Sequence, residues 1–373
     1  MAGVVTRIVL LWYFPLLSDD IYRYYFDGTM ILEGKNPYGL LPTDVFQHNE
    51  TRLPLTILER MNSPNYFTVY PPLAQGLFAL AALGDNVEQF AMNLKLILLL
   101  LECGGLYFIV ILSQRFLGNT SASIWYFLNP LVIIEGVGNL HFEVLIVAFM
   151  APMVYFFLEK KYIKSSFYYV LAIAAKLLPL ILLPLLFLKL PKEKRFIFLA
   201  VLVFGLTLFF LPFVFQPGFF TLFESIDLYF QKFEFNASIY VILREIGLFL
   251  SGYNLIYYLG PFLGLLTIFG IFKVLKFYQH IGFNLVFKPM VLMYSLYFIL
   301  STTIHPWYII PILFFGSFTG FVYPVVWSYV VVLSYVHYSD FSPLIKQSMY
   351  IVEYVLLFGT MYWDWKSQKL LQI

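Results

Sequence analysis

The chain has 373 residues, of which 61% are hydrophobic and only 12% are charged. A soluble domain has about a quarter charged residues, so this balance is typical of an integral membrane protein and excludes a disordered chain or a coiled coil. Aromatic residues make up 21% of the chain, which suits lipid-facing surfaces and interfacial belts. The net charge is +2 and no strongly basic block occurs, so we expect no binding of nucleic acid.

Apolar segments recur along the whole chain. A spanning helix needs about 20 mostly apolar residues, and about ten to twelve candidate transmembrane or re-entrant segments emerge on that criterion. The clearer segments are residues 91–112, 121–137, 142–158, 196–215, 255–272, 289–302, 307–318, 321–336 and 349–362, and the weaker ones are 4–17, 70–83 and 167–188. The sequence therefore predicts an all-α, polytopic membrane protein with a single membrane-embedded domain over residues 1–373.

Clusters of basic residues orient these segments in the membrane. They occur at 159–164, 189–195, 273–276 and 366–369, and the positive-inside rule places all four on the cytoplasmic side. The external side then receives a long loop, residues 18–69, and a second segment, residues 216–244. Because strict alternation does not fit every segment, we expect that either 70–83 or 167–188 does not cross fully. Segment 167–188 contains Lys176, Pro179 and Pro184, which favours a broken or re-entrant helix.

Two adjacent carboxylates, Asp19 and Asp20, open the long external loop. Side chains at successive positions diverge, so one of them can face a site while the other caps a helix that begins at Ile21. Arg23 and Asp27 are four residues apart on the same face of that helix, and their mutual ion pair is the simplest account of both.

Polar side chains also interrupt three apolar stretches further along. Such groups near hydrocarbon are costly and are usually functional, although a buried structural network is the alternative. Lys176 either extends to the interface or holds an anion. The other candidates are Glu135, Asn139, His141 and Glu143, which interrupt the apolar residues around 129–143, and His305, Trp307 and Tyr308 at a junction on the external side.

Metal ligation has little support in the sequence. The five histidines form no HxxH or HxxxH pair, and Cys103 is the lone cysteine, so we predict no metal site. No cofactor is predicted either, although a pair of aspartates is chemically suited to a divalent cation.

Eight short motifs follow one another along the chain: LSDDIYRY at 17–24, NPY at 36–38, YPP at 70–72, NP at 129–130, NLHFE at 139–143, KLLP at 176–179, FNAS at 235–238 and HPWY at 305–308. Together they resemble the bacterial GT-C superfamily mannosyltransferases that use a polyprenyl-phosphate sugar, notably the lipomannan-type α-1,6-mannosyltransferases. The resemblance runs from about Ser18 to about Pro311. One departure is His141-Phe142-Glu143, where those enzymes tend to have His-Asn-Asp, and it bears on the identity of the acceptor and of the sugar.

The resemblance implies a GT-C-like enzyme whose first external loop carries the catalytic residue, Asp20 or else Asp19, and whose donor enters from the bilayer. Transfer from a polyprenyl phosphate expels a good leaving group, so one base on the acceptor hydroxyl and positive charge near the phosphate suffice. The residues predicted to bind the donor phosphate are Arg244, His305, Lys176 and Arg23. Those predicted to bind the acceptor or the sugar are His141, Glu143, Asn139, Tyr22, Trp307 and Tyr308.

The expected function is transfer of a hexose, with mannose preferred, from a polyprenyl-phosphate sugar to an extracytoplasmic glycan or glycolipid acceptor. Inversion with an Asp base is favoured, and the active site is expected on the outer side of a bacterial inner membrane. The alternative function is a transporter or flippase of lipid-linked sugars. Such a protein would place its acids at mid-membrane and often contains repeated halves.

Overall fold

The computed structural model describes residues 2–221, 232–280, 282 and 285–370. All regular elements in this part of the chain are helices, and the one β contact is an isolated parallel bridge between Phe235 and Thr303. The predicted all-α class is therefore confirmed. Residues 222–231 of the predicted second external segment lie outside the described residues.

The elements are α1 Ala2–Leu10, α2 Asp20–Leu32, η1 Pro37–Gly39, α3 Pro42–Gln47, α4 Leu55–Arg60, α5 Pro72–Ala81, α6 Val87–Leu117, α7 Ser121–Phe127, η2 Val132–Gly138, α8 Glu143–Leu158, α9 Tyr162–Ala175, η3 Leu178–Leu182, α10 Leu183–Lys189, α11 Lys192–Val214, α13 Ile239–Ser251, α14 Ile256–Tyr278, α15 Phe287–Ile299, η5 Pro306–Ile309, α16 Ile310–Gly316, α17 Tyr323–Val330, η6 Val331–Tyr338 and α18 Pro343–Leu370.

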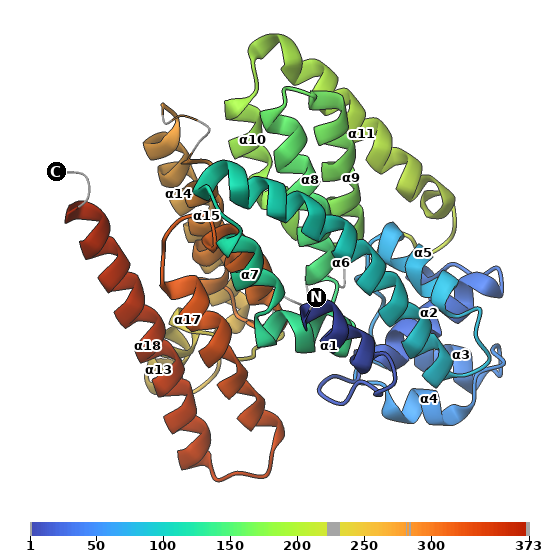
Figure 1. Ribbon diagram of the computed structural model, residues 1–373. Helices are drawn as coiled ribbons and strands as arrows, with labels where there is room; N and C mark the ends of the chain where they lie inside the picture. Colours follow the sequence, from blue (N-terminus) through green and yellow to red (C-terminus); the bar gives the residue numbers. More distant parts are fainter. Residues whose placement is uncertain (1, 222–231, 281, 283–284, 371–373) are drawn as a thin grey trace. The chain divides into compact units, whose positions relative to one another are not determined.

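The chain packs as two compact units. Unit 1 comprises Met1–Ile109, Ile133–Leu180 and Leu190–Asp227, and unit 2 comprises Val110–Val132, Ile181–Lys189 and Leu228–Ile373. Unit 1 runs from blue to light green in Figure 1, and most of unit 2 runs from yellow to red. The expectation of a single domain over residues 1–373 remains a prediction.

Helices α8, α9 and α11 lie side by side in unit 1 (Figure 1). The Ser165 hydroxyl of α9 donates to the Met153 carbonyl of α8 at 2.9 Å, and Lys176 beyond the end of α9 pairs with Glu143 at the start of α8, so α8 and α9 are antiparallel. The Ser166 hydroxyl donates to the Phe198 carbonyl of α11 at 2.7 Å. Further along both helices, a methyl group on Gly205 of α11 would meet Val170 of α9. The contacts therefore advance in the same direction on both helices, so α9 and α11 run parallel.

This arrangement gives the three-helix group two chemically different ends. The basic clusters at 159–164 and 192–195 both lie at the end formed by the start of α9 and the start of α11. The other end carries Glu143, Lys176 and the exit of α11, where the Asn36 amide of the first loop donates to the Pro217 carbonyl at 3.1 Å. The predicted external loop and the start of the predicted second external segment therefore meet at the end of unit 1 opposite the basic residues.

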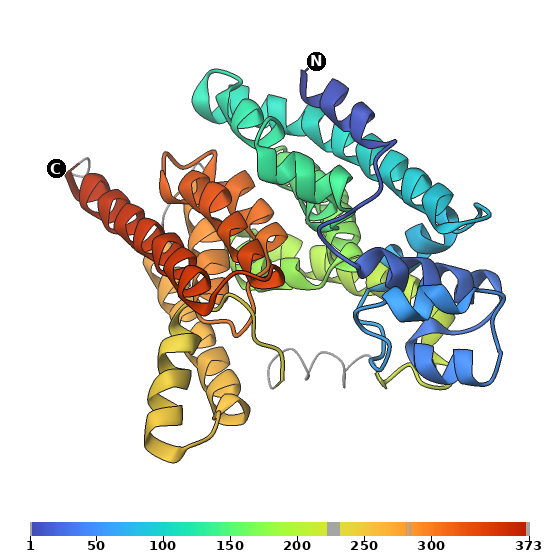
Figure 2. The ribbon, with the colours of Figure 1, turned by 90° about the horizontal axis from the view of Figure 1, so that it is seen from below.

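Helix α2 packs closely on α5 because Gly28 has no side chain. A Cβ at Gly28 would lie 2.4 Å from the Phe78 carbonyl oxygen, and the Tyr24 ring stacks on Phe78 with centroids 4.5 Å apart. The short helices α3 and α4 pack on one another and α4 packs on α2, which makes the first loop an ordered structure (blue in Figure 2).

Helix α1 is shorter than the predicted segment 4–17. The Lys95 ammonium of α6 donates to the carbonyls of Leu10 and Tyr13, the former at 2.9 Å, and this satisfies carbonyls at the helix end. Arg7 is fully buried and its Nη2 lies 2.7 Å from Oε1 of Glu102 on α6. The basic residue that interrupts the first apolar run is therefore compensated by a buried carboxylate.

Unit 2 contains helices α7, α10 and α13 to α18. Helices α13 and α14 form a pair joined through Gly252, whose φ of 78° is left-handed (yellow and light orange in Figure 2). Helix α18 packs along α17, and Asp364 of α18 accepts hydrogen bonds from the backbone N–H groups of Val322 and Tyr323 at 2.8 and 2.9 Å. This carboxylate satisfies two of the free N–H groups at the start of α17.

Three described helices, α6, α11 and α14, are long and apolar enough to cross a membrane, and η2 with α8 forms a fourth candidate that is bent by 104°. Continuous spans are thus fewer than the ten to twelve predicted segments. One reason is that proline interrupts an apolar stretch, as Pro179 does after the end of α9. Segment 167–188 is broken at Lys176, as predicted, and α5 has only 10 residues, which is too short for a span.

Candidate active site

Helix α2 begins at Asp20, and this residue is the centre of a polar site in unit 1. Nδ2 of Asn62 donates to Oδ1 of Asp20 at 2.8 Å, while the Tyr24 hydroxyl lies 3.5 Å from Oδ2. The backbone N–H of Asp20 donates to Oγ of Ser18 at 3.3 Å. Asp19 occupies the N-cap position, but its side chain is exposed and makes no capping hydrogen bond. Of the two aspartates, Asp20 is the one that surrounding side chains hold.

Lys176 lies where α9 ends. Pro179 has no N–H group to donate to the Ala175 carbonyl, so the helix stops and Lys176 is extended. Its ammonium forms an ion pair with Oε1 of Glu143, whose side chain is fully buried, and it also acts electrostatically on Asp20. The structure thus brings Asp20, Lys176 and Glu143, three of the predicted site residues, into one neighbourhood.

Burial raises the pKa of the Asp20 carboxyl above its usual value, because the loss of water disfavours the charged form. The Asn62 amide, the Lys176 charge and the hydroxyls of Ser18 and Tyr24 act in the opposite direction. Part of the Asp20 side chain remains accessible to solvent. A carboxylate with a raised pKa is a stronger base than an ordinary one, so this group can accept a proton from a bound hydroxyl.

Glu135, Asn139 and His141 form a buried network beside this site. Oε2 of Glu135 lies 3.4 Å from Nε2 of His141 and accepts a hydrogen bond from the Asn139 amide at 3.4 Å. The Asn139 carbonyl oxygen in turn accepts from the backbone N–H of Leu17 at 3.5 Å. Glu135 lies on a π-helix that ends at Gly138, just before Asn139, and Leu140 has a left-handed φ of 67°. Both features are frequent at functional sites.

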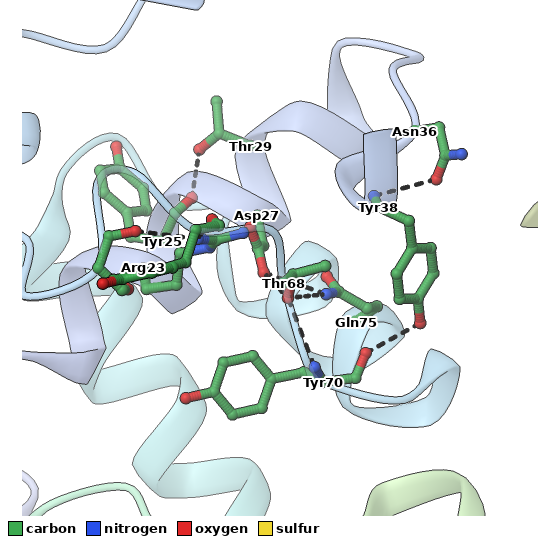
Figure 3. A network of polar contacts seen from close by, with 11 residues as sticks. Arg23, Tyr25, Asp27, Thr29, Asn36, Tyr38, Thr68, Tyr70 and Gln75 are labelled. Carbon is green, nitrogen blue, oxygen red and sulfur yellow. Dashed lines mark hydrogen bonds and ion pairs between the residues drawn. The ribbon is translucent and has the colours of Figure 1, made fainter. Parts of the chain in front are cut away.

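Figure 3 shows a second buried network, around Asp27. Nε of Arg23 lies 2.8 Å from Oδ1 of Asp27, and Oδ2 accepts hydrogen bonds from Thr68 at 2.6 Å and from Gln75 at 3.1 Å. The ion pair that the four-residue spacing favoured is present. The hydrogen bonds from Thr68 and Gln75 to Asp27 join α2 to the end of the first loop and to α5.

The segment between α4 and α5 is fastened to α2 by two arginines. Nη1 of Arg23 donates to the carbonyls of Ser63 and Tyr66 at 3.3 and 2.6 Å. Nη1 of Arg60 donates to the Tyr22 hydroxyl at 3.2 Å. Tyr22, a predicted sugar-binding residue, is only 6% exposed, and Arg23 is engaged with protein groups of the loop.

Arg244, a predicted donor-phosphate residue, lies on α13 in unit 2. Its Nη1 is 3.2 Å from Oε2 of Glu234, and its Nη2 is 2.7 Å from Oε1 of Glu245. Both of these partners are carboxylates, so a phosphate at Arg244 would compete with them for the guanidinium.

His305, Trp307 and Tyr308 are brought together by the short helix η5 in unit 2. The His305 ring stacks on Trp307, with centroids 4.5 Å apart, and on Phe235, with centroids 4.8 Å apart. Tyr308 meets the His305 ring edge-on at 5.3 Å. The predicted histidine is thus held in a stack of aromatic rings.

Two polar residues at these sites were not singled out from the sequence. Asn62 is a loop residue in no recognisable motif, so no sequence signal marks it. Glu353 interrupts the apolar segment 349–362 and could have been found by the argument that pointed to Glu143; it accepts hydrogen bonds from the Asn236 amide at 3.0 and 3.1 Å. Among the described residues no group of three His, Cys, Asp or Glu side chains could hold a metal ion.

Apolar helices that contain paired charges, with a carboxylate site at one end of unit 1, define a polytopic membrane protein. The chain belongs to the family described as alpha-(1->6)-mannopyranosyltransferase, N-terminal domain, which matches residues 3–191. The matched range contains the Asp20, Glu143 and Lys176 site. The predicted resemblance to α-1,6-mannosyltransferases is therefore confirmed.

A curated relative supports the same family. The chain is 26% identical over 180 residues to alpha-(1->6)-mannopyranosyltransferase A of Corynebacterium glutamicum. The alignment covers 48% of this chain and 36% of the relative, so the match spans about a third of the length of that relative.

Proposed function

We propose that this protein is a membrane mannosyltransferase that transfers mannose from a polyprenyl phosphate to a glycan or glycolipid acceptor on the extracytoplasmic side of a bacterial inner membrane. The family supports mannosyl transfer, and the name of the Corynebacterium glutamicum relative supports the same chemistry. The observation that carries the proposal is Asp20, a carboxylate held at the start of α2 near Lys176.

In the proposed reaction Asp20 takes the proton of the acceptor hydroxyl as the oxygen attacks the anomeric carbon. The bond from that carbon to the phosphate oxygen breaks, and the polyprenyl phosphate leaves with both electrons. A single displacement of this kind inverts the configuration and needs only one carboxylate.

Charge on the leaving phosphate needs cations or hydrogen-bond donors. In unit 1, Lys176 acts electrostatically on the Asp20 carboxylate, and we propose it for the phosphate at this site. The donor-phosphate roles of Arg244 and His305, which lie in unit 2, stay predictions. Arg23 fits this role less well, because its guanidinium holds Asp27 and two loop carbonyls. Glu143, His141 and Asn139 remain proposed for the sugar or the acceptor.

The experiment is transfer of labelled mannose from polyprenyl-phosphate mannose by the purified protein, with and without a chelator. We expect Asp20→Asn to lower kcat by roughly 10²-fold or more, since it removes the base while keeping the shape. Asp19→Asn is the matched control and should keep near-normal turnover, because Asp19 is exposed. Near-normal turnover of Asp20→Asn, or transfer only from a nucleotide sugar, would contradict the proposal.

A further inference from the structure

We propose that Asn62 is a positioning residue that fixes the Asp20 carboxylate so that Oδ2 is the oxygen that takes the acceptor proton. This inference rests on the proposed function, in which Asp20 is the base. Asn62 itself does not contact the reacting atoms.

The two oxygens of Asp20 have unequal partners. Oδ1 accepts a hydrogen bond of 2.8 Å from the Asn62 amide, whereas the Tyr24 hydroxyl is 3.5 Å from Oδ2, a distance at which a hydrogen bond is weak. Of these two contacts, the one at Oδ2 is the longer and weaker. Tyr24 is itself fixed, because its ring stacks on Phe78 with centroids 4.5 Å apart.

Asn62 can fix Asp20 only if its own backbone is held, and the structure shows how. On one side Arg60 donates to the Tyr22 hydroxyl at 3.2 Å. On the other side Arg23 donates to the Ser63 and Tyr66 carbonyls. Two arginines thus fasten the residues that flank Asn62 to the helix that carries Asp20.

A hydrogen bond donated to a carboxylate favours the ionised form, so Asn62 keeps Asp20 ready to accept a proton at neutral pH. The other groups that act on Asp20 are Lys176 at the end of α9, Tyr24 on α2, and Ser18 before α2. Asp19 is the adjacent charged residue in the chain. Removal of Asn62 leaves all of these in place and takes away one stabilising donor.

The test measures the protonation of Asp20 directly as well as the activity. Infrared titration of the carboxyl band that is absent in Asp20→Asn gives the midpoint for Asp20 in the full-length protein. We expect Asn62→Ala to raise this midpoint by about 0.5–1 pH unit. Asn62→Asp, which adds a second carboxylate, should raise it further. Asn65→Ala is the matched control, since Asn65 is an exposed asparagine in the same segment.

Kinetics complete the test. We expect Asn62→Ala to lower kcat several-fold with little change in the acceptor KM, and to move the acid limb of the pH profile upward with the infrared midpoint. An unmoved midpoint, or an effect confined to the acceptor KM, would overturn the inference, and the latter would make Asn62 an acceptor-binding residue. Full activity of Asp20→Asn with a shifted midpoint in Asn62→Ala would instead remove the proposed base and leave the contact intact.

Discussion

The Lys176–Glu143 pair shows how a single residue can serve both the fold and the site. Glu143 is fully buried on α8, and Lys176 keeps 27% of its side chain exposed. The ammonium of Lys176 compensates the buried carboxylate, since a buried charge without a partner would be strongly destabilising. The same ammonium favours the ionised form of Asp20. Lys176 therefore connects the packing of α8 and α9 with the proposed base.

We predict that Lys176→Met lowers the free energy of unfolding by about 3 kcal/mol, because it leaves Glu143 buried and unpaired. This is the lower end of the range for a broken buried ion pair, since Lys176 is partly exposed. The double variant Lys176→Met/Glu143→Gln should recover most of this loss. Unfolding in detergent, followed by near-ultraviolet circular dichroism, measures both. Lys192→Met, at an exposed position on α11, is the control. Equal stability of Lys176→Met and wild type would mean that the pair does not contribute.

At the scale of elements, the first loop is attached to the exit of α11 by two glycines. A Cβ at Gly218 would lie 2.2 Å from Cα of Gly39, and a Cβ at Gly39 would lie 2.6 Å from the Pro217 carbonyl oxygen. Gly218 also has a left-handed φ of 79°, which glycine adopts without penalty. No larger residue allows this approach of the two backbones.

We predict that Gly218→Ala lowers stability by about 1–3 kcal/mol and releases the loop, because backbone atoms must move and the left-handed conformation becomes strained. Hydrogen exchange at residues 36–41 should rise. Gly104→Ala on α6 is the matched control, since a methyl group there meets no other atom within 4 Å and alanine favours the helix. Unchanged exchange in Gly218→Ala would show that the two segments are held by other contacts.

Most elements could be predicted from the sequence because long apolar runs and prolines act locally. The break at Lys176 and the Arg23–Asp27 pair both follow from spacing along one helix. The contact between Asn62 and Asp20 joins residues 42 positions apart, and no local pattern encodes it. The sequence marks Lys176 and Glu143 as separate candidate site residues. That they form an ion pair depends on the antiparallel packing of α8 and α9, which the sequence does not predict.

At the scale of the whole molecule, the predicted topology assigns the two ends of unit 1 to opposite sides of the membrane. We predict that Asp19→Cys and His305→Cys react with an impermeant thiol reagent from outside the cell, whereas Lys160→Cys reacts only after the membrane is opened. The positive-inside rule is the physical reason, since basic residues near helix ends stay in the cytoplasm. Cys103→Ala supplies the background, because Cys103 is the lone cysteine. Labelling of Asp19→Cys only from inside would place the proposed active site in the cytoplasm.

The buried pair of Arg7 with Glu102 has a consequence for the order in which the protein is built into the membrane. The two residues are 95 positions apart, and synthesis proceeds at about 5–20 residues per second, so several seconds separate them on the ribosome. An unpaired arginine in hydrocarbon is costly. The charge of Arg7 is therefore compensated only once α6 has supplied Glu102, so we expect α1 and α6 to reach their final packing in the membrane together.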